Sequence, residues 1–240
     1  MHSLEVAELK KSYNGKTIVS DINMNIGSGE VVGLLGPNGA GKTTTFYMIL
    51  GLVSSDSGLI YLDGEDLKNF PMYKRARKGI GYLPQETSIF RRLSVKDNLM
   101  AVLELTETSK DEKEHKLKGI LEEFNLVPFA ERYGYQLSGG ECRRAEIARA
   151  LALDPLFILL DEPFAGIDPI AVIELKKTFT QLKDKGIGLI ITDHNVRETL
   201  SITDRAYIIS DGRILAHGVP DELVSDELVK KSYLGEEFRL

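Results

Sequence analysis

The sequence predicts an α/β fold with a mainly parallel sheet, an antiparallel β lobe and a helical lobe. From residue 157 onward, short apolar runs alternate with helical patterns, which is typical of a parallel sheet with crossover helices. Residues 4–30 alternate apolar and polar positions instead, and residues from about 88 to 150 lack buried strands. The 240 residues, 42% of them hydrophobic, can bury one substantial core, so we expect a single domain.

The N-terminal part of the chain is predicted to form the antiparallel lobe. Residues 4–30 have the alternation of short strands, and Asn14 with Gly15 marks a turn between two of them. A second hairpin-like stretch covers residues 59–63. Residues 31–35 (VVGLL) form an uninterrupted apolar run, which predicts a buried strand of the parallel sheet.

The helical lobe follows. Ser109 and Glu112 have the spacing of a capping box, which predicts a helix start. Ser138 and Glu141 repeat this spacing before a second helical pattern. The first helix carries an apolar stripe that we interpret as core packing, formed by Leu117, Ile120, Leu121 and Phe124.

The C-terminal part returns to strands and then to a charged helix. Residues 207–215 predict a hairpin around the turn at Asp211 and Gly212. A charged helix with Leu223, Leu228 and Val229 follows. The last stretch, LGEEFRL, is too short for a domain and is expected to fray.

Residues 36–43 (GPNGAGKT) fit the phosphate-loop pattern GxxxxGK[ST] directly after a predicted strand. The glycines let the backbone N–H groups point inward, Lys42 can reach the β and γ phosphates, and the Thr43 hydroxyl can bind Mg²⁺. An ornamental glycine-rich turn is the alternative, and the preceding strand argues against it. The predicted nucleotide-binding residues are Gly36, Pro37, Asn38, Gly39, Ala40, Gly41, Lys42, Thr43 and Thr44.

Two adjacent carboxylates end the apolar run at residues 157–160. Asp161 is placed to hold Mg²⁺ through water, and Glu162 can polarise a water molecule that attacks the γ phosphate. Successive residues of a strand point in different directions, so the two acids can have different roles. The alternative, that they only solvate a strand end, is disfavoured downstream of a phosphate loop.

Residues 137–141 (LSGGE) form a second helix start that contains glycines. The free N–H groups of Gly139 and Gly140 and the Ser138 hydroxyl can bind an anion there, next to Glu141. An ordinary capped helix is the alternative. Taken together with the phosphate loop, this segment resembles the signature sequence of the nucleotide-binding subunits of ATP-binding cassette (ABC) transporters.

That resemblance covers nearly the whole chain and implies ATP and Mg²⁺ as cofactors. It implies a P-loop NTPase core at 4–86 and 156–218, a helical subdomain at about 88–155, and a C-terminal helix and tail at 219–240. It also implies a homodimer, in which the signature segment of one subunit closes over the γ phosphate held by the other.

The resemblance assigns roles to four further residues. Tyr13 is similar to the aromatic residue that stacks on adenine, and Gln85 to the glutamine that contacts Mg²⁺ and the attacking water. His194 resembles the switch histidine at the γ phosphate, and Asp168 the acid of a loop that crosses the dimer interface. The alternatives are a packing tyrosine, a solvated amide and a structural histidine. Ala165 and Gly166 (in AGID) and Cys142 depart from the family pattern.

Longer segments of the sequence resemble one particular group within this family. GIGYLPQETSIFRRLSVKDNLMAVLEL, ILLDEPFAGIDPIAVIELK and YLGEEFRL resemble the ATPase subunits of bacterial lipopolysaccharide exporters. This implies two transmembrane partner subunits, a place on the cytoplasmic face of the inner membrane, and no direct contact with the cargo. We expect the partners to dock on Ile89, Phe90 and the neighbouring Arg91 and Arg92, and we interpret Leu93, Val95 and Leu99 as core.

Net charge and cysteine content argue against several other classes of function. A net charge of −6 opposes a broad nucleic-acid footprint, so no direct nucleic-acid binding is expected. Lys74, Arg75, Arg77 and Lys78 form either a local basic patch or, more simply, a solvated helix face. One cysteine excludes an internal disulfide, and neither a leader nor a stretch of about 18 apolar residues is present.

Three other functions stay open. A branched-chain amino-acid importer would share every catalytic residue and differ only in the partner-facing segments. A soluble ABC-type ATPase acting on DNA or ribosomes predicts a long coiled-coil insertion or two cassettes in one chain. A P-loop kinase would leave two features unexplained: LSGGE, and the expected position of Glu162 and His194 at the same edge of the sheet, each after an apolar strand.

Overall fold

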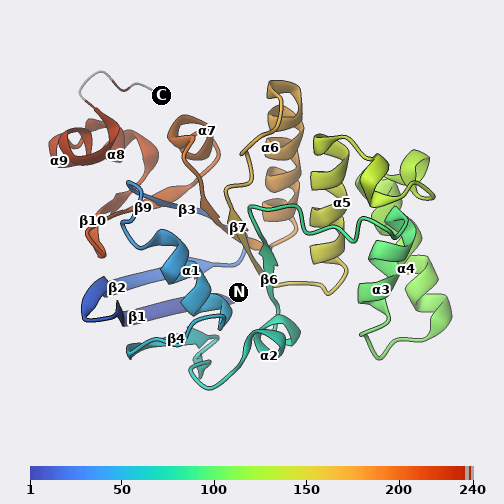
Figure 1. Ribbon diagram of the computed structural model, residues 1–240, viewed down its shortest axis with the longest axis horizontal. Coiled ribbons are helices and arrows are strands. Elements are labelled where there is room, and N and C mark those ends of the chain that lie inside the picture. The colour runs from blue at the N-terminus through green and yellow to red at the C-terminus, as the bar shows by residue number, and fades with distance from the viewer. Residues whose placement is uncertain (236–237, 239–240) are drawn as a thin grey trace.

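The computed structural model describes residues 1–235 and 238 and is built on one ten-stranded sheet in the order β5-β4-β1-β2-β10-β9-β3-β8-β7-β6 (Figure 1). The strands are β1 (Ser3–Tyr13), β2 (Lys16–Gly27), β3 (Val31–Leu35), β4 (Ser57–Leu62), β5 (Glu65–Asp66), β6 (Ile80–Leu83), β7 (Phe157–Asp161), β8 (Gly188–Thr192), β9 (Arg205–Ser210) and β10 (Arg213–Gly218). The α-helices are α1 (Lys42–Leu50), α2 (Met72–Arg77), α3 (Val95–Leu103), α4 (Lys110–Glu123), α5 (Gly139–Leu151), α6 (Pro169–Asp184), α7 (Val196–Leu200), α8 (Pro220–Ser225) and α9 (Glu227–Val229). Three single turns complete the described elements, η1 (Val127–Phe129), η2 (Gly134–Gln136) and η3 (Lys230–Leu234).

The sheet has a parallel part and an antiparallel part. Strands β6, β7, β8, β3 and β9 pair in parallel, whereas β2, β1, β4 and β5 pair antiparallel. The β9–β10 hairpin joins the two parts, and β10 pairs with β2 at Arg213 and Asp21. The predicted mainly parallel core with an antiparallel lobe is confirmed.

The core lies on both faces of the parallel strands. Phe157 and Leu159 of β7 and Ile190 of β8 pack into the cluster that contains the buried side of α1. The intervening residues, such as Ile158 and Leu160, pack on the opposite face with α5 and α6. This alternation decides on which side of the sheet a polar residue at a strand end emerges.

Helices α3, α4 and α5 form the helical part at one end of the molecule (Figure 1). Both predicted capping boxes are present, so α4 begins after Ser109 and α5 after Ser138. The predicted apolar stripe of α4 is buried, which confirms it as core. Within residues 1–235 and 238, every helix is too short or too polar to cross a lipid bilayer.

Two expectations for the C-terminal end were wrong. The single charged helix is divided into α8, α9 and η3, because Asp226 ends the first segment and caps the second by accepting from the N–H groups of Leu228 and Val229. Phe238, which was expected to fray, packs against the cluster that contains Leu35. Residues 236–237 and 239–240 of the predicted fraying tail lie outside the described residues.

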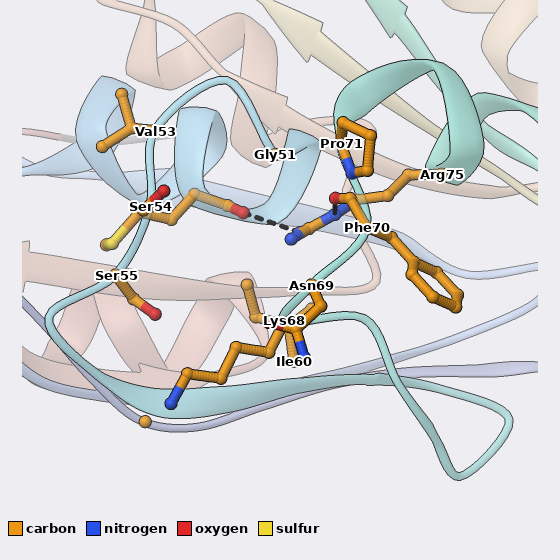
Figure 2. A pocket seen from close by; sticks show the side chains of 12 residues that line it. Gly51, Val53, Ser54, Ser55, Ile60, Lys68, Asn69, Phe70, Pro71 and Arg75 are labelled. Atoms are coloured by element: carbon orange, nitrogen blue, oxygen red, sulfur yellow. Dashed lines mark hydrogen bonds between the residues drawn. The ribbon is translucent and has the colours of Figure 1, made fainter.

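Arg75 corrects the interpretation of the basic segment on α2. Its side chain is only 4% exposed, so it belongs neither to a solvated face nor to a surface patch. The guanidinium donates to the carbonyl oxygens of Met48 (2.8 Å), Ile49 (2.7 Å) and Leu67 (2.8 Å), next to the cavity shown in Figure 2. Met48 and Ile49 lie in the last turn of α1, so two of these bonds reach carbonyl groups at the C-terminus of that helix. Burial lowers the pKa of Arg75.

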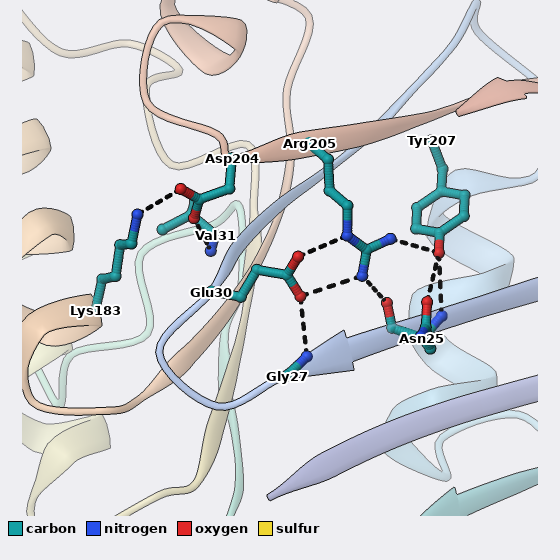
Figure 3. A network of polar contacts seen from close by, with 8 residues as sticks. All are labelled: Asn25, Gly27, Glu30, Val31, Lys183, Asp204, Arg205 and Tyr207. Atoms are coloured by element: carbon teal, nitrogen blue, oxygen red, sulfur yellow. Dashed lines mark hydrogen bonds and ion pairs between the residues drawn. The ribbon is translucent and has the colours of Figure 1, made fainter. Parts of the chain in front are cut away.

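A polar network fixes the starts of β3 and β9 (Figure 3). Glu30 accepts from Arg205 Nε at 2.5 Å and from the Gly27 N–H at 2.9 Å. Arg205 also donates to the Tyr207 hydroxyl at 2.6 Å, and Asp204 accepts from the Val31 N–H at 2.9 Å. The network holds the beginning of β3, whose other end carries the phosphate loop.

Candidate active site

The loop of residues 36–41 connects β3 to α1, as the sequence predicts. A Cβ atom at Gly36 would lie 2.0 Å from the carbonyl oxygen of Ile209, and one at Gly41 would lie 2.8 Å from that of Ile18. Gly41 also has a φ of 106°, a conformation that favours glycine. Because Gly41 offers no side-chain cap, the first N–H groups of α1 are free to bind an anion.

Lys42 lies inside the curve of this loop. Its Nζ atom donates to the carbonyl oxygens of Gly36 at 2.7 Å and Pro37 at 3.0 Å. Burial lowers the pKa of Lys42, and the nearby Glu162 and Asp161 oppose that shift. The Lys42 ammonium is thus held in a loop whose backbone N–H groups can bind phosphate. The next residue, Thr43, is exposed.

The two predicted carboxylates leave β7 in different environments. Asp161 is buried, and burial with the negative charge of Glu162 raises its pKa to about 6, against the opposing effects of Tyr82 and Lys42. Glu162 has a φ of 47°, in the left-handed region, and its N–H donates to the Thr192 carbonyl at 2.6 Å. Strained backbone of this kind concentrates at functional sites.

Three candidate catalytic residues meet at one oxygen atom. Oε2 of Glu162 lies 2.7 Å from Nε2 of His194 and accepts a hydrogen bond from Nε2 of Gln85 at 2.5 Å. The Glu162 side chain is 13% exposed and that of His194 57%. The expectation that His194 and Glu162 lie at the same sheet edge is confirmed, whereas the bond from Gln85 was not foreseen.

Asp193 is a structural residue of this site that sequence reasoning missed. Its buried carboxylate accepts from the Phe164 N–H at 3.0 Å and from the Asn195 N–H at 2.8 Å. It therefore ties the loop that follows Glu162 to the loop that carries His194. The signal in the sequence was an acid between an apolar strand and a candidate histidine.

The LSGGE segment forms the N-terminus of α5 within the helical part. Ser138 Oγ accepts from the Glu141 N–H at 3.3 Å, and Glu141 Oε2 accepts from the Ser138 N–H at 2.8 Å. The second bond lowers the pKa of Glu141. Gly139 and Gly140 occupy the first turn of the helix, so their N–H groups have no partner within it. Burial raises the pKa of Cys142, the departure from the family pattern, to about 11.

Helix α5 also holds the segment that follows Gln85. Buried Glu146 accepts from the Ile89 N–H at 3.1 Å and from the Ser88 N–H, and it pairs with Arg143 Nη1 at 3.1 Å. The same Arg143 nitrogen donates to the Pro84 carbonyl at 2.8 Å. Sequence reasoning missed this link, although an ionisable residue on the apolar side of a helix was a signal for it.

The predicted docking segment is only partly exposed. Phe90 is 51% exposed, and the Arg149 guanidinium lies 4.9 Å from the centre of its ring. Ile89 is buried, so its expected role as a surface anchor was wrong. Leu93 is 37% exposed, so its assignment to the core was wrong as well. Val95 and Leu99 are fully buried, as predicted.

Two exposed tyrosines extend this surface. The rings of Tyr133 and Tyr135 stack with their centres 5.6 Å apart. The Tyr135 N–H donates to the carbonyl of Arg91 at 3.1 Å, so the tyrosines lie beside the docking segment. We call the exposed set Phe90, Leu93, Tyr133 and Tyr135 the aromatic patch.

Tyr13 and Asp168 are two further residues for which the sequence predicts a role. Tyr13 ends β1 and is half-exposed, with Lys11 Nζ 5.3 Å from the centre of its ring. Asp168 caps α6 by accepting from the N–H groups of Ile170 and Ala171, both at 3.0 Å. The cap gives Asp168 a structural role, and its interface role stays a prediction.

The oxygen donors at this edge fit Mg²⁺ better than a transition metal. They are the Asp161 carboxylate, the exposed Thr43 hydroxyl and the Gln85 amide oxygen, all hard ligands. The part of the chain that the structure describes contains no cluster of three His, Cys, Asp or Glu side chains for a metal. Mg²⁺ bound together with nucleotide phosphates needs only one or two protein carboxylates.

Comparisons with known proteins agree with this arrangement. The family described as "ABC transporter" matches residues 19–165, and a shorter profile, "Branched-chain amino acid ATP-binding cassette transporter", matches residues 213–239. The lipopolysaccharide export system ATP-binding protein LptB of Escherichia coli (strain K12) is 56% identical over 241 residues, which cover 100% of both chains. LptB of Haemophilus influenzae has the same identity and coverage.

Solved structures share the fold. A crystal structure of the ADP conformation of an ABC transporter cassette has a TM-score of 0.88 at 27% identity, covering 98% of this chain and 100% of that one. A dimeric cassette in a post-hydrolysis state, bound to ADP and Pi, has a TM-score of 0.79 at 25% identity, covering 90% and 98%. The chain therefore belongs to the ABC transporter family, as an ATP-binding subunit that hydrolyses ATP.

Proposed function

We propose that this chain is the ATPase of a lipopolysaccharide exporter and that its hydrolysis powers extraction of lipopolysaccharide from the inner membrane. The observation that carries the proposal is the end-to-end identity of 56% with proteins named as lipopolysaccharide export ATPases. The match covers the whole of both chains, so it includes the segments around Phe90 and the C-terminus, where ABC systems differ from one another.

In the proposed reaction the chain's own groups bind and orient ATP. The Lys42 ammonium exchanges the carbonyl groups of Gly36 and Pro37 for the β and γ phosphates, and the free N–H groups of the loop surround them. Thr43, Asp161 and Gln85 would hold Mg²⁺. When bound, the ion would neutralise part of the charge on the phosphates. Tyr13 stacks on the adenine ring.

Glu162 is the proposed general base. The bonds from Gln85 and His194 leave its carboxylate as an acceptor in a fixed orientation, directed to take a proton from the attacking water. Gln85 orients that water, and His194 donates to the γ phosphate as the charge on it grows.

The complete site requires a second copy of the chain. Ser138 and the free N–H groups of Gly139 and Gly140 close over the γ phosphate bound by the partner copy. ATP stabilises the closed dimer only through its higher affinity for that state, so binding closes the dimer and hydrolysis reopens it. The dimeric post-hydrolysis structure of a similar cassette supports this arrangement, and Asp168 lies in a loop expected at the interface.

Two transmembrane subunits are the proposed partners, on the cytoplasmic face of the inner membrane. They dock on Phe90 and Arg91, within and beside the aromatic patch, because exposed aromatic and arginine side chains are favoured at interfaces. The link from Arg143 and Glu146 to the segment after Gln85 connects this surface to the ATP site.

A second candidate function has its own observation. The profile of branched-chain amino-acid transporters matches residues 213–239, which favours an importer. Reconstitution separates the two, by pairing the chain with exporter or importer membrane subunits in liposomes. Stimulated ATP hydrolysis together with lipopolysaccharide release only with the exporter subunits is the expected result. Stimulation only by importer subunits, with uptake of a branched-chain amino acid, would overturn the proposal.

A further inference from the structure

Thr192 ends strand β8 with a hydroxyl that has no partner among the described residues. The residue is 1% exposed, and its Oγ1 atom neither donates nor accepts within residues 1–235 and 238. Its carbonyl is used, since it accepts from the Glu162 N–H. Buried hydroxyl groups nearly always have a partner, so an orphan beside a catalytic loop requires an explanation.

The register places this hydroxyl beside Asp161. Thr192 of β8 pairs with Asp161 of β7, and two residues earlier Ile190 pairs with Leu159. Ile190 and Leu159 both pack into the cluster on the α1 side of the sheet. Because strand side chains alternate, Thr192 and Asp161 emerge on that same side, at the same edge.

The other neighbour of β8 is the strand that carries the phosphate loop. Ile191 pairs with Gly33 of β3, so the next residue, Thr192, lies level with Leu34, two residues before the loop begins at Gly36. The hydroxyl therefore lies between the strand that ends in Asp161 and the strand that leads to Lys42. The three preceding residues of β8 are apolar, so the hydroxyl of Thr192 is the polar exception at the end of this buried run.

We propose that Thr192 is a positioning residue of the magnesium site, its hydroxyl helping Asp161 to hold the water shell of Mg²⁺ bound with ATP. The inference rests on the proposed magnesium site and adds a residue to it. A carboxylate that binds a metal through water requires outer groups to fix both, and removal of such a partner commonly weakens metal affinity 10–100-fold.

The test compares Thr192→Val, which keeps the shape and removes the hydroxyl, with Thr192→Ser, which keeps the hydroxyl. Thr178→Val is the matched control, because Thr178 is buried in α6 and its hydroxyl donates to the Glu174 carbonyl. The readout is the Kd of Mg²⁺, and of Mn²⁺ by electron paramagnetic resonance, at saturating ADP. Nucleotide affinity in EDTA and Tm are measured in parallel.

For Thr192→Val we expect about tenfold weaker Mg²⁺ and Mn²⁺ binding, with unchanged nucleotide affinity in EDTA and an unchanged Tm. Thr192→Ser and Thr178→Val should match the wild type. If Thr192→Val fails to fold, Thr192→Ser against Thr192→Ala gives the same comparison, since both lose the methyl group. Equal metal affinity with and without the hydroxyl would overturn the inference. A wild-type protein that binds ADP but takes up neither Mg²⁺ nor Mn²⁺ at saturating ADP would instead overturn the proposed magnesium site.

Discussion

The Nε2 atom of His194 lies 2.7 Å from the Oε2 atom of Glu162, the oxygen to which Gln85 also donates. The three residues come from three different loops, at the ends of β7, β8 and β6. Both neighbours contact the same carboxylate oxygen of Glu162, so the orientation of this carboxylate is fixed before any water reaches it. This geometry leads to the first prediction.

Glu162→Gln should bind ATP and hydrolyse it at least about 10²-fold more slowly, because the amide cannot accept the proton of the attacking water. The variant should accumulate as an ATP-bound dimer. Steady-state hydrolysis, ATP binding and size exclusion with ATP measure these three properties. Glu227→Gln, an exposed substitution in α9, is the control and should behave as the wild type. Rapid ATP hydrolysis by Glu162→Gln would show that Glu162 is not the general base.

Asp161→Asn should raise stability near neutral pH in EDTA. The folded protein holds the pKa of Asp161 at about 6, above its ordinary value of 3.8, so the folded state binds this proton more tightly. The stabilising contribution is complete below about pH 4 and is lost as the pH rises through 6. We expect the variant to gain about 2–4 °C in Tm at pH 7.5, the shift that about 1 kcal/mol gives in a domain of this size. The gain should vanish near pH 4; equal Tm values at both pH values would contradict the prediction.

Phe90→Ala should leave ATP binding intact and weaken assembly with the membrane subunits. Phe90 is half-exposed and makes its aromatic contact with Arg149, so the truncation removes surface rather than core. Loss of a central aromatic contact at an interface typically costs 2 kcal/mol or more, about 30-fold in affinity. Co-purification with the membrane subunits is the measurement. Leu105→Ala, an exposed apolar residue beyond the other end of α3, is the control. Unchanged co-purification of Phe90→Ala would defeat the prediction.

Glu146→Ala should destabilise the fold by about 3–5 kcal/mol, because it leaves the buried Arg143 without its partner. It also removes the acceptor of the Ile89 N–H. Urea denaturation measures the change. Glu131→Ala, which breaks an exposed pair with Lys96, should cost less than about 1 kcal/mol. Equal effects of the two substitutions would show that the Glu146 network does not stabilise the protein.

Local patterns predicted the elements and most of the site. The strand before the phosphate loop, the caps at Ser109 and Ser138, and the acids after β7 depend on residues close in sequence, so the sequence contained enough information for them. The likeness to a family then supplied Gln85 and His194, whose roles no spacing could give.

Contacts between distant segments were beyond such patterns. The bond from Gln85 to Glu162 spans 77 residues, and that from Glu146 to Ile89 spans 57. Ile89 and Leu93 are similar in hydrophobicity, yet only Ile89 is buried, in the cluster that also contains residues of α5. Arg75 has the charge of a surface residue, and four carbonyl groups folded around it decide its burial.

The cap at Ser138 uses only one part of its hydroxyl group. Oγ accepts the Glu141 N–H through a lone pair, and this bond does not consume the hydroxyl's own hydrogen. One atom thus serves the fold as an acceptor and keeps a donor for an anion that approaches α5. Ser138→Asp would keep the acceptor that caps α5 and replace the donor with a negative charge. Folding of α5 and recognition of phosphate are therefore separable at a single side chain.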